Sequence, residues 1–329
     1  MIVSIWGSGL FCMKKASSFE IRMNSNLSFE RNNMSNTRKI GIATDTNSGI
    51  TLKEAEEHGL GIIPMPFFID EEEFFEGLTV TREVFFEKLK GGADIKTSQP
   101  SPASLCELWD KMLETYEELI YIPMSSGLSS SMSTARMMAE DYDGKVHVID
   151  NHRISVTQKQ SVYEALYMAE QGKSSAEIVE LLDRTAMDAS IYVAVDTLEY
   201  LKKGGRVTPA GAALASILNL KPVLQIQGDK LDAYAKVRGE KAAQEKMLQA
   251  VEKDINTRFA GKKVYIKGAY TCSEEAAEAW KQKIMDRFPG YDIELDPLAL
   301  SIGCHIGEGA TAITCTVENI EAPEIERMI

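Results

Sequence analysis

Hydroxyl side chains are concentrated in three short stretches of this 329-residue chain, each of which we expect to follow a strand. They are residues 44–48, 97–101 and 125–131, and a helical pattern follows each one. The first N–H groups of a helix are free to bind an anion, and neighbouring hydroxyl groups add further donors. Because the carboxyl ends of parallel strands meet at one sheet edge, we expect the three turns to lie together and to hold a carboxyl or phosphate group. Taken singly, each Ser or Thr would more simply cap its helix.

A serine of the third turn, Ser126 or Ser129, could instead be a nucleophile with His305 as its base. The nucleophile elbow of hydrolases reads G-x-S-x-G after a strand. Here Gly127 precedes Ser129, but Ser131 stands where the second glycine belongs. No motif supplies an acidic partner for the histidine. A serine-dependent hydrolase of a lipid or small ester is therefore kept as the alternative function.

Two further side chains could face an anionic ligand. His305 lies among Gly303, Gly307 and Gly309, and glycines let the backbone approach another group closely. Arg206 follows two glycines that come directly after a helical pattern. It is either an exposed residue behind a capped helix or a cation that faces a ligand or a partner protein.

The composition argues against several function classes. A net charge of −13 disfavours electrostatic binding to nucleic acid or to an anionic membrane surface. No apolar run approaches the ~20 residues of a membrane span, so we expect no stable membrane insertion. The four histidines lack zinc-site spacing, and no P-loop or dinucleotide fingerprint occurs, so we expect no metal and no cofactor. Five cysteines without a CxxC pair fit the reducing cytoplasm.

From residue 39 onward, strand and helix patterns alternate, which predicts parallel strands covered by helices. We expect the following strands: 40–44, 60–68, 119–124, 145–150, 192–195, 264–270, 293–298 and 313–317, with a hairpin over 223–227 and 231–237. We expect the following helices: 51–58, 103–115, 129–139, 155–171, 174–188, 210–218, 240–258, one capped by Thr81 and one opened by Ser273. The acidic residues 70–73 predict a solvated loop.

The domain organisation follows from these patterns. Residues 39–190 and 191–329 predict an N-terminal and a C-terminal α/β domain, and because no Pro-, Gly- or Ser-rich linker separates them, we expect them to pack face to face. Residues 1–38 lack a regular pattern, which predicts a disordered leader or an upstream extension. Whether Met1 or Met34 is the true start is left open.

Several motifs, in order, resemble the DegV family of fatty-acid-binding proteins over residues 39–317. They are residues 42–46 (IATDT), 96–101 (KTSQPS), 125–129 (SSGLS), 148–150 (VID), 196–207 (DTLEYLKKGGRV), 221–224 (KPVL) and the glycine-flanked His305. The resemblance implies two α/β domains packed face to face with the ligand tunnel between them. It also implies a non-enzymatic, cytoplasmic carrier of a long-chain fatty acid such as palmitate or oleate.

The resemblance further implies which residues hold the carboxyl group. Hydroxyl groups of Thr97 and Ser129 would bind it, His305 would assist, and Ser126 and Arg206 would lie near it. In some family members a separate fatty acid kinase then converts the bound acid into an acyl phosphate, so a kinase is an expected partner.

The chain departs from the family pattern at three places. Ser130 and Ser131 replace a common Gly-Thr, and residues 156–160 (VTQKQ) replace a commoner Gly-Gln-Gly. Glu308 lies close to His305 in sequence and would repel a carboxylate unless its side chain points away. These departures bear on the chain preference and the kinase partner more than on the fold.

Overall fold

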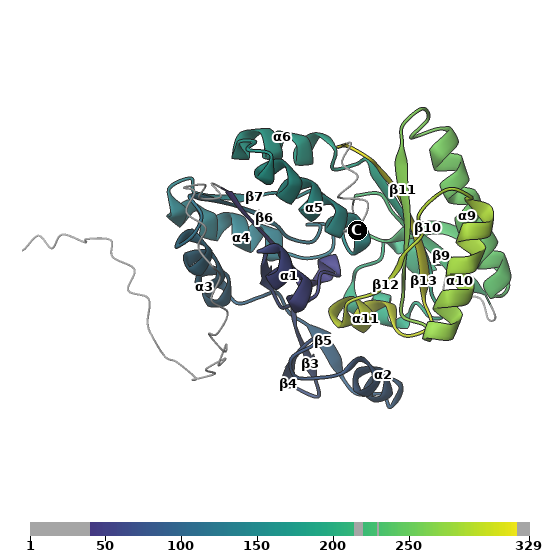
Figure 1. The fold of residues 1–329 in the computed structure, drawn as a ribbon. Coiled ribbons are helices and arrows are strands. Elements are labelled where there is room, and N and C mark those ends of the chain that lie inside the picture. Colours follow the sequence, from purple (N-terminus) through teal and green to yellow (C-terminus); the bar gives the residue numbers. More distant parts are fainter. Residues whose placement is uncertain (1–39, 214–219, 229, 321–329) are drawn as a thin grey trace, which may run out of the picture. The chain divides into compact units, whose positions relative to one another are not determined.

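The computed structural model describes residues 40–213, 220–228 and 230–320, which belong to one compact unit (Figure 1). The expectation of a leader over residues 1–38 lies outside the described residues, as does the question of the starting methionine. The helix expected at 210–218 is described only in its first part, as α8, Pro209–Ala213.

A parallel four-stranded sheet forms the first part of the fold. Its order is β2-β1-β6-β7, and every neighbouring pair is parallel, as the sequence predicts. The strands are β1 (Ile40–Asp45), β2 (Gly61–Ile63), β6 (Glu118–Ile122) and β7 (Val146–Val148). The helices and turns around it are η1 (Thr46–Ser48), α1 (Leu52–His58), α3 (Pro102–Leu113), α4 (Ser131–Ala139), η2 (Glu140–Tyr142), α5 (Val156–Glu170) and α6 (Ser175–Arg184).

The helix starts predicted from capping residues are confirmed. Ser101 accepts a hydrogen bond from the Ser104 N–H group, with Pro102 at the first helical position. Ser174 and Glu177 form a reciprocal capping box at the start of α6. These caps fix where each helix leaves the preceding loop.

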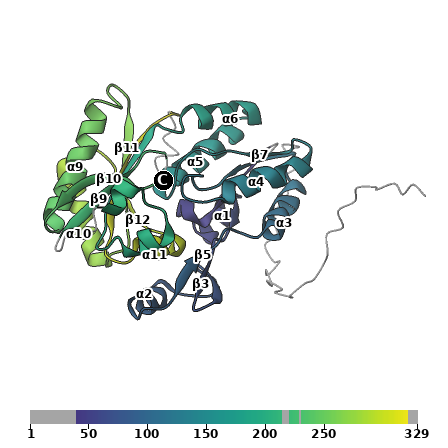
Figure 2. The ribbon, with the colours of Figure 1, turned by 180° about the vertical axis from the view of Figure 1, so that it is seen from behind.

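A small antiparallel sheet projects from the parallel sheet (Figures 1 and 2). It contains β3 (Pro66–Ile69), β4 (Glu72–Phe75) and β5 (Ile95–Thr97), in the order β4-β3-β5, and it carries α2 (Arg82–Lys90). We call residues 66–97 the arm. Pro64 and Pro66 divide the strand expected over 60–68 into β2 and β3, since proline cannot donate a ladder hydrogen bond.

The arm corrects two expectations. The acidic loop expected at 70–73 is only a two-residue turn, Asp70 and Glu71, both with positive φ, and the next two glutamates begin β4. The turn at 97–101 follows β5, so it belongs to the antiparallel arm and does not follow a strand of the parallel sheet. The periodicity of a three-residue strand is too short to reveal its partner.

A six-stranded sheet forms the second part, in the order β10-β9-β8-β13-β11-β12. Its strands are β8 (Ala189–Ala194), β9 (Lys221–Ile226), β10 (Asp232–Val237), β11 (Val264–Tyr270), β12 (Leu295–Pro297) and β13 (Thr311–Val317). Its helices are α7 (Glu199–Gly204), α8, α9 (Glu240–Asn256), α10 (Glu274–Arg287) and α11 (Leu300–Ile306). The predicted β9–β10 hairpin is confirmed.

The expectation of parallel strands is wrong for most of this sheet. Only the β11–β12 pair is parallel, because the closing strand β13 returns between β8 and β11 and runs antiparallel to both. The alternation of strand and helix patterns along a sequence does not encode such a strand order.

Both faces of the six-stranded sheet are buried. Successive side chains of a strand point to opposite faces, so each strand contributes to two cores. On β8, Tyr192 and Ala194 belong to the core beneath α9 and α10, which cover the outer face in both views (Figures 1 and 2). Ile191 and Val193 point the opposite way and belong to a core that also contains Leu128 of the first part. The inner face of this sheet therefore turns toward the loops of the parallel sheet. The α/β class is confirmed, while the division into domains at residue 190 stays a prediction.

Candidate functional site

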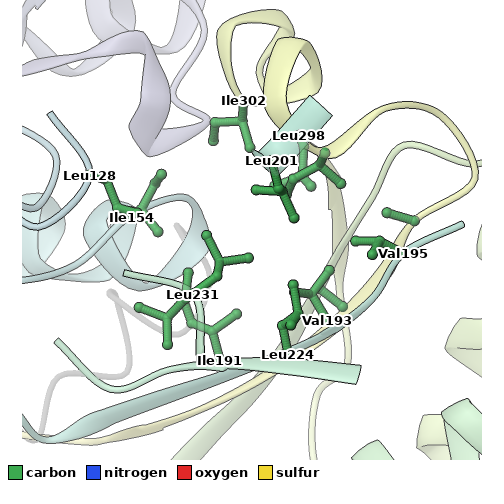
Figure 3. Packing of buried hydrophobic residues seen from close by; sticks show 14 of the residues in the cluster. Leu128, Ile154, Ile191, Val193, Val195, Leu201, Leu224, Leu231, Leu298 and Ile302 are labelled. Carbon is green, nitrogen blue, oxygen red and sulfur yellow. The ribbon is translucent and has the colours of Figure 1, made fainter. Parts of the chain in front are cut away.

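A cavity of about 320 Å³ lies between the inner face of the six-stranded sheet and the loops of the first part. Its apolar lining comes from both parts of the fold: Met65, Met124, Leu128, Ile154, Ile191, Val193, Leu201, Ile226, Leu231, Ala269, Leu298, Ile302, Ile306 and Ala312. In Figure 3, Leu128 and Ile154 lie across an open space from Leu201 and Leu298. Pockets of this size and character are typical of small-ligand sites.

Four of the five predicted site residues line this one cavity: Thr97, Ser129, Arg206 and His305. We call them the head cluster. Thr97 Oγ1 and His305 Nε2 are 2.9 Å apart and share a hydrogen bond. Residues 208 positions apart in the sequence thus meet where the end of β5 contacts α11.

Ser129 and Arg206 are held by local hydrogen bonds. Ser129 Oγ accepts from the Ser131 N–H group at 3.1 Å. Arg206 Nε donates to the Leu128 carbonyl oxygen at 3.0 Å, and its Nη1 donates to the Gly204 carbonyl oxygen. The helix before it ends at Gly205, which has a φ of 69°. Gly205 therefore caps α7, and Arg206 lines the cavity. That Arg206 faces a ligand or a partner protein stays a prediction.

Ser126 lies apart from the head cluster. It is not among the described residues that line the cavity, and its backbone N–H group donates to Asp150 Oδ1 at 3.2 Å. The cavity therefore gives no support to the prediction that Ser126 binds the carboxyl group.

The first hydroxyl-rich turn has mainly a structural role. Thr44 Oγ1 donates to the Ile122 carbonyl oxygen, and Ser48 Oγ donates to the Asp45 carbonyl oxygen. Asp45 accepts hydrogen bonds from the N–H groups of Asn47 and Met124, although its burial raises its pKa to about 6. These two hydroxyl groups therefore neither cap a helix nor line the cavity, and of this turn only Asn47 lines it.

His305 is a neutral group in this site. Burial, and then the nearby Arg206 guanidinium, lower the pKa of His305 to about 4. The head cluster therefore offers hydroxyl groups, a neutral imidazole and one guanidinium charge. This combination suits a single carboxylate, because its donors and its one cation offset the cost of removing the anion from water.

Helix α11 places His305 in the cavity and separates the cavity from the arm. Ser301, Ile302, His305 and Ile306 line the cavity, whereas Leu300 and Cys304 are buried in the apolar core of the arm. A Cβ atom at Gly303 would lie 3.3 Å from a ring carbon of Phe85, so glycine allows the helix to pack closely on α2. No helix was predicted here from the sequence, although the four-residue spacing of Ser301 and His305 is a helical signal.

The arm also holds the N-terminal end of α11. Glu76 Oε2 accepts from the Leu300 N–H group at 2.9 Å. Arg82 donates through Nη1 to the Leu298 carbonyl oxygen at 2.8 Å and through Nη2 to that of Tyr270 at 3.0 Å. Burial raises the pKa of Glu76 to about 7, although the hydrogen bond from Leu300 and the charge of Arg82 both lower it. The arm thus determines the position of α11 at both of its ends.

Glu308 does not face the head cluster. Its carboxylate pairs with Lys90 Nζ at 2.6 Å, and it is not among the described residues that line the cavity. The repulsion that its place in the sequence suggested is therefore avoided.

A second cavity of about 500 Å³ adjoins the head cluster on its outer side. Thr97, Arg206 and His305 line both cavities. The outer one, which we call the outer groove, is also lined by Lys96 and Lys203, and both of these lysines pair with Asp94, at 2.6 and 2.7 Å. The head cluster thus separates an apolar interior from a polar groove.

In the described ranges, no group of three His, Cys, Asp or Glu side chains could hold a metal ion. Among the helices that the structure describes, none is long and apolar enough to span a bilayer.

Fold and site together define an α/β protein in which two sheets enclose an apolar cavity that ends in a polar head. The family model described as "Uncharacterised protein, DegV family" matches residues 39–318, and the chain belongs to this family. A DegV domain-containing protein of Listeria innocua is 29% identical over 283 residues, which cover 85% of this chain and 99% of the relative. One from Deinococcus radiodurans is 28% identical over 275 residues, which cover 83% and 97%.

Solved structures have the same fold. A DegV family protein from Thermus thermophilus, described by its fatty acid binding, matches with a TM-score of 0.79 and 27% identity over 85% of this chain and 100% of that chain. DegV from Bacillus subtilis, described as a fatty acid binding protein, matches with a TM-score of 0.76 and 25% identity over 85% and 99%. The family and the DegV-like fold predicted from the ordered motifs are thereby confirmed.

Proposed function

We propose that this chain is a carrier that encloses one long-chain fatty acid, such as palmitate or oleate. The carboxyl group lies at the head cluster, and the acyl chain fills the apolar cavity. The observation that carries the proposal is that Thr97, Ser129, Arg206 and His305 all line one end of a cavity whose other walls are mostly apolar. The fatty acid binding described for the Thermus and Bacillus relatives supports it.

The energetics agree with this division of the cavity. Each buried methylene contributes about 0.8 kcal/mol, so a sixteen-carbon chain contributes roughly 10 kcal/mol before the cost of ordering is subtracted. The head cluster adds little net affinity, since its donors mainly replace water around the carboxylate. It fixes instead which end of the ligand faces the outer groove.

The carrier would then present the carboxyl group to a fatty acid kinase in the cytoplasm, which forms the acyl phosphate. Thr97, Arg206 and His305 line both the cavity and the outer groove, so a bound carboxyl group is reachable from outside. Lys96 and Lys203 in the groove, both on its exposed side, would attract the phosphate groups of the kinase nucleotide.

The alternative of a serine hydrolase receives less support from the geometry. His305 Nε2 bonds to Thr97, and the Ser129 hydroxyl accepts a hydrogen bond from the Ser131 N–H group. The charged group that shifts the pKa of His305 is Arg206, a cation, whereas a catalytic histidine of this kind is oriented by a carboxylate.

The double variant Thr97→Val with Ser129→Ala tests the head cluster. We expect it to weaken fatty acid binding about tenfold or more, because the buried carboxylate then lacks two hydrogen-bond partners, and a buried group left unsatisfied costs more than its hydrogen bonds contribute in net affinity. Binding is measured by calorimetry on the full chain, and circular dichroism confirms that the fold is intact. The matched control is Thr115→Val with Ser133→Ala, two exposed residues outside the cavity. Equal affinity of the double variant and its control would contradict the placement of the carboxyl group at the head cluster.

A further inference from the structure

We propose that the cavity holds a second oxygen-binding site, made by Asn47, Ser155 and Ser301, and that the preferred ligand is a fatty acid with a hydroxyl or keto group a few carbons from its carboxyl end. We call these three residues the second polar cluster. The inference rests on the proposed function, because it requires the carboxyl group to lie at the head cluster.

The three residues come from different elements and meet at the cavity wall. Ser301 Oγ donates to Asn47 Oδ1 at 2.6 Å, and the Ser155 N–H group donates to the Asn47 carbonyl oxygen at 2.8 Å. All three line the cavity, and their exposed fractions are only 2%, 7% and 6% for Asn47, Ser155 and Ser301. A polar group this deeply buried normally has its hydrogen bonds satisfied.

The second polar cluster is not fully satisfied. Asn47 is the better satisfied member, since its side-chain amide donates to the sulfur of Met124 at 2.9 Å and also interacts with the Asp45 carboxylate. Ser155 is the N-cap residue of the fifteen-residue helix α5, yet its side chain makes no capping hydrogen bond. The N-cap serines of α3, α6 and α10 make one, whereas Ser130 of α4 does not. The buried hydroxyl of Ser155 therefore faces the cavity with capacity to spare.

The backbone at Ser155 keeps this hydroxyl from its capping position. Its φ of 56° and ψ of −141° lie in a region that favours glycine. The four other N-cap serines of the described helices have φ between −65° and −82°. Ser155 is held in this conformation partly by the hydrogen bond from its N–H group to Asn47, so the same contact that joins the cluster turns its hydroxyl away from the helix.

The spacing along α11 sets the distance between the two polar clusters. Ser301 and His305 are four residues apart on one helix, and both line the cavity. Four residues advance a helix by about 6 Å, so the second polar cluster lies one turn from the head cluster on the same wall. An acyl chain that starts at His305 passes it within its first several carbons.

The unsatisfied group defines the chemistry of the ligand. The hydroxyl of Ser155 both donates and accepts, so it suits a hydroxyl or a keto oxygen. A plain methylene at this place leaves that hydroxyl without a partner, and a site built to bind an oxygen discriminates against the analogue that lacks it.

The test compares three acids on the full chain after removal of any lipid bound during purification. They are palmitic acid, the same acid with a hydroxyl group near the carboxyl end, and the same acid with a hydroxyl group on its last carbon. Calorimetry is expected to show about tenfold tighter binding of the second acid than of the first, which is the effect of one good hydrogen bond to a buried group. The third acid is expected to bind more weakly than either.

Two variants link this preference to the cluster. Ser155→Gly removes the hydroxyl while accepting the backbone conformation, and Ser301→Ala removes the neighbouring hydroxyl within a helix. Both are expected to bind the hydroxylated acid and palmitic acid with similar affinity, whereas Ser133→Ala, at an exposed position, keeps the preference.

The outcomes separate the inference from the proposed function. If the wild-type chain binds palmitic acid but does not favour the hydroxylated acid, only water occupies the second polar cluster and the inference is wrong. If a preference exists but persists in both variants, the oxygen binds elsewhere and the assignment is overturned. If no acid binds in any form, the proposed function itself fails, and the inference fails with it.

Discussion

The two walls of the cavity are built in different ways. The wall from the first part consists of loops at strand ends, and it contributes Thr97 and Ser129. The wall from the second part consists mainly of alternate residues of regular strands, such as Ile191 and Val193 on β8 and Ala312 on β13. Arg206 and His305 add its polar part, from the turn after α7 and from α11. Loops place polar atoms at single positions, whereas a strand face presents a continuous surface of side chains.

This difference explains how one cavity can be both selective and tolerant. The loop residues recognise one chemical group, because each hydrogen bond depends on the position of a single atom. The strand face binds any apolar chain that fits, because apolar contact depends on area and not on direction. Substitutions in the two walls should therefore have different effects, and the following predictions test that difference.

The largest effect is expected from filling the strand wall with Ala312→Phe. Ala312 lines the cavity and pairs across the sheet with Val193 and Ala269, which line it too. A phenyl ring there occupies space that the acyl chain needs, and affinity for every fatty acid should fall about hundredfold. Calorimetry measures the affinity, and Ala279→Phe, at an exposed position on α10, is the control. Unchanged affinity would mean that the chain binds elsewhere.

A smaller and more specific effect is expected from Arg206→Ala. Arg206 lines both the cavity and the outer groove, and it carries the guanidinium charge of the head cluster. Acyl-phosphate formation by a fatty acid kinase should fall about tenfold or more, while affinity for the fatty acid falls only a few fold, since the acyl chain provides most of the binding. The rate of acyl-phosphate formation and the affinity for the fatty acid are measured on the same preparations of the wild-type chain and the variant. Equal losses of acyl-phosphate formation and of affinity would show that Arg206 acts only in binding the fatty acid.

The smallest effect concerns the arm, through Glu76→Gln. Burial holds the pKa of Glu76 near 7 in the folded chain, while in the unfolded chain it has its ordinary value near 4.5. The folded state therefore binds more protons between these values, so this carboxyl group lowers stability as the pH rises from about 4.5 to 7. Glutamine still accepts the Leu300 N–H bond but does not ionise.

The variant should consequently have a higher melting temperature than the wild-type chain at pH 8, by a few degrees at most, and no advantage at pH 4. Thermal unfolding monitored by circular dichroism at both pH values checks this, with Glu73→Gln, an exposed residue of the same hairpin, as the control. An advantage that does not change with pH would show that ionisation of Glu76 is not its cause.

Much of the fold could be predicted from the sequence because its signals are local. The caps at Ser101 and Ser174, the hairpin of β9 and β10, and the buried strands of the parallel sheet all depend on residues within a few positions of one another. The antiparallel pairing of β13 joins residues 41 to 53 positions apart on the β11 side and 117 to 127 positions apart on the β8 side, and no local pattern reports it.

The site shows the same limit. Thr97, Ser129, Arg206 and His305 were predicted from motifs, and the structure brings all four to one cavity. The role of α11 was missed, because the helix has only seven residues and contains a glycine. Its stability comes from packing between the cavity and the arm, which is a tertiary effect that outweighs its weak helix propensity.

The central claim is that the chain encloses one fatty acid, and native mass spectrometry of the purified chain tests it most directly. We predict one long-chain fatty acid per chain, released by organic solvent and identified in the extract, and its absence from Ala312→Phe prepared in parallel. Repeated preparations that carry no fatty acid and do not take up added palmitate or oleate would contradict the claim.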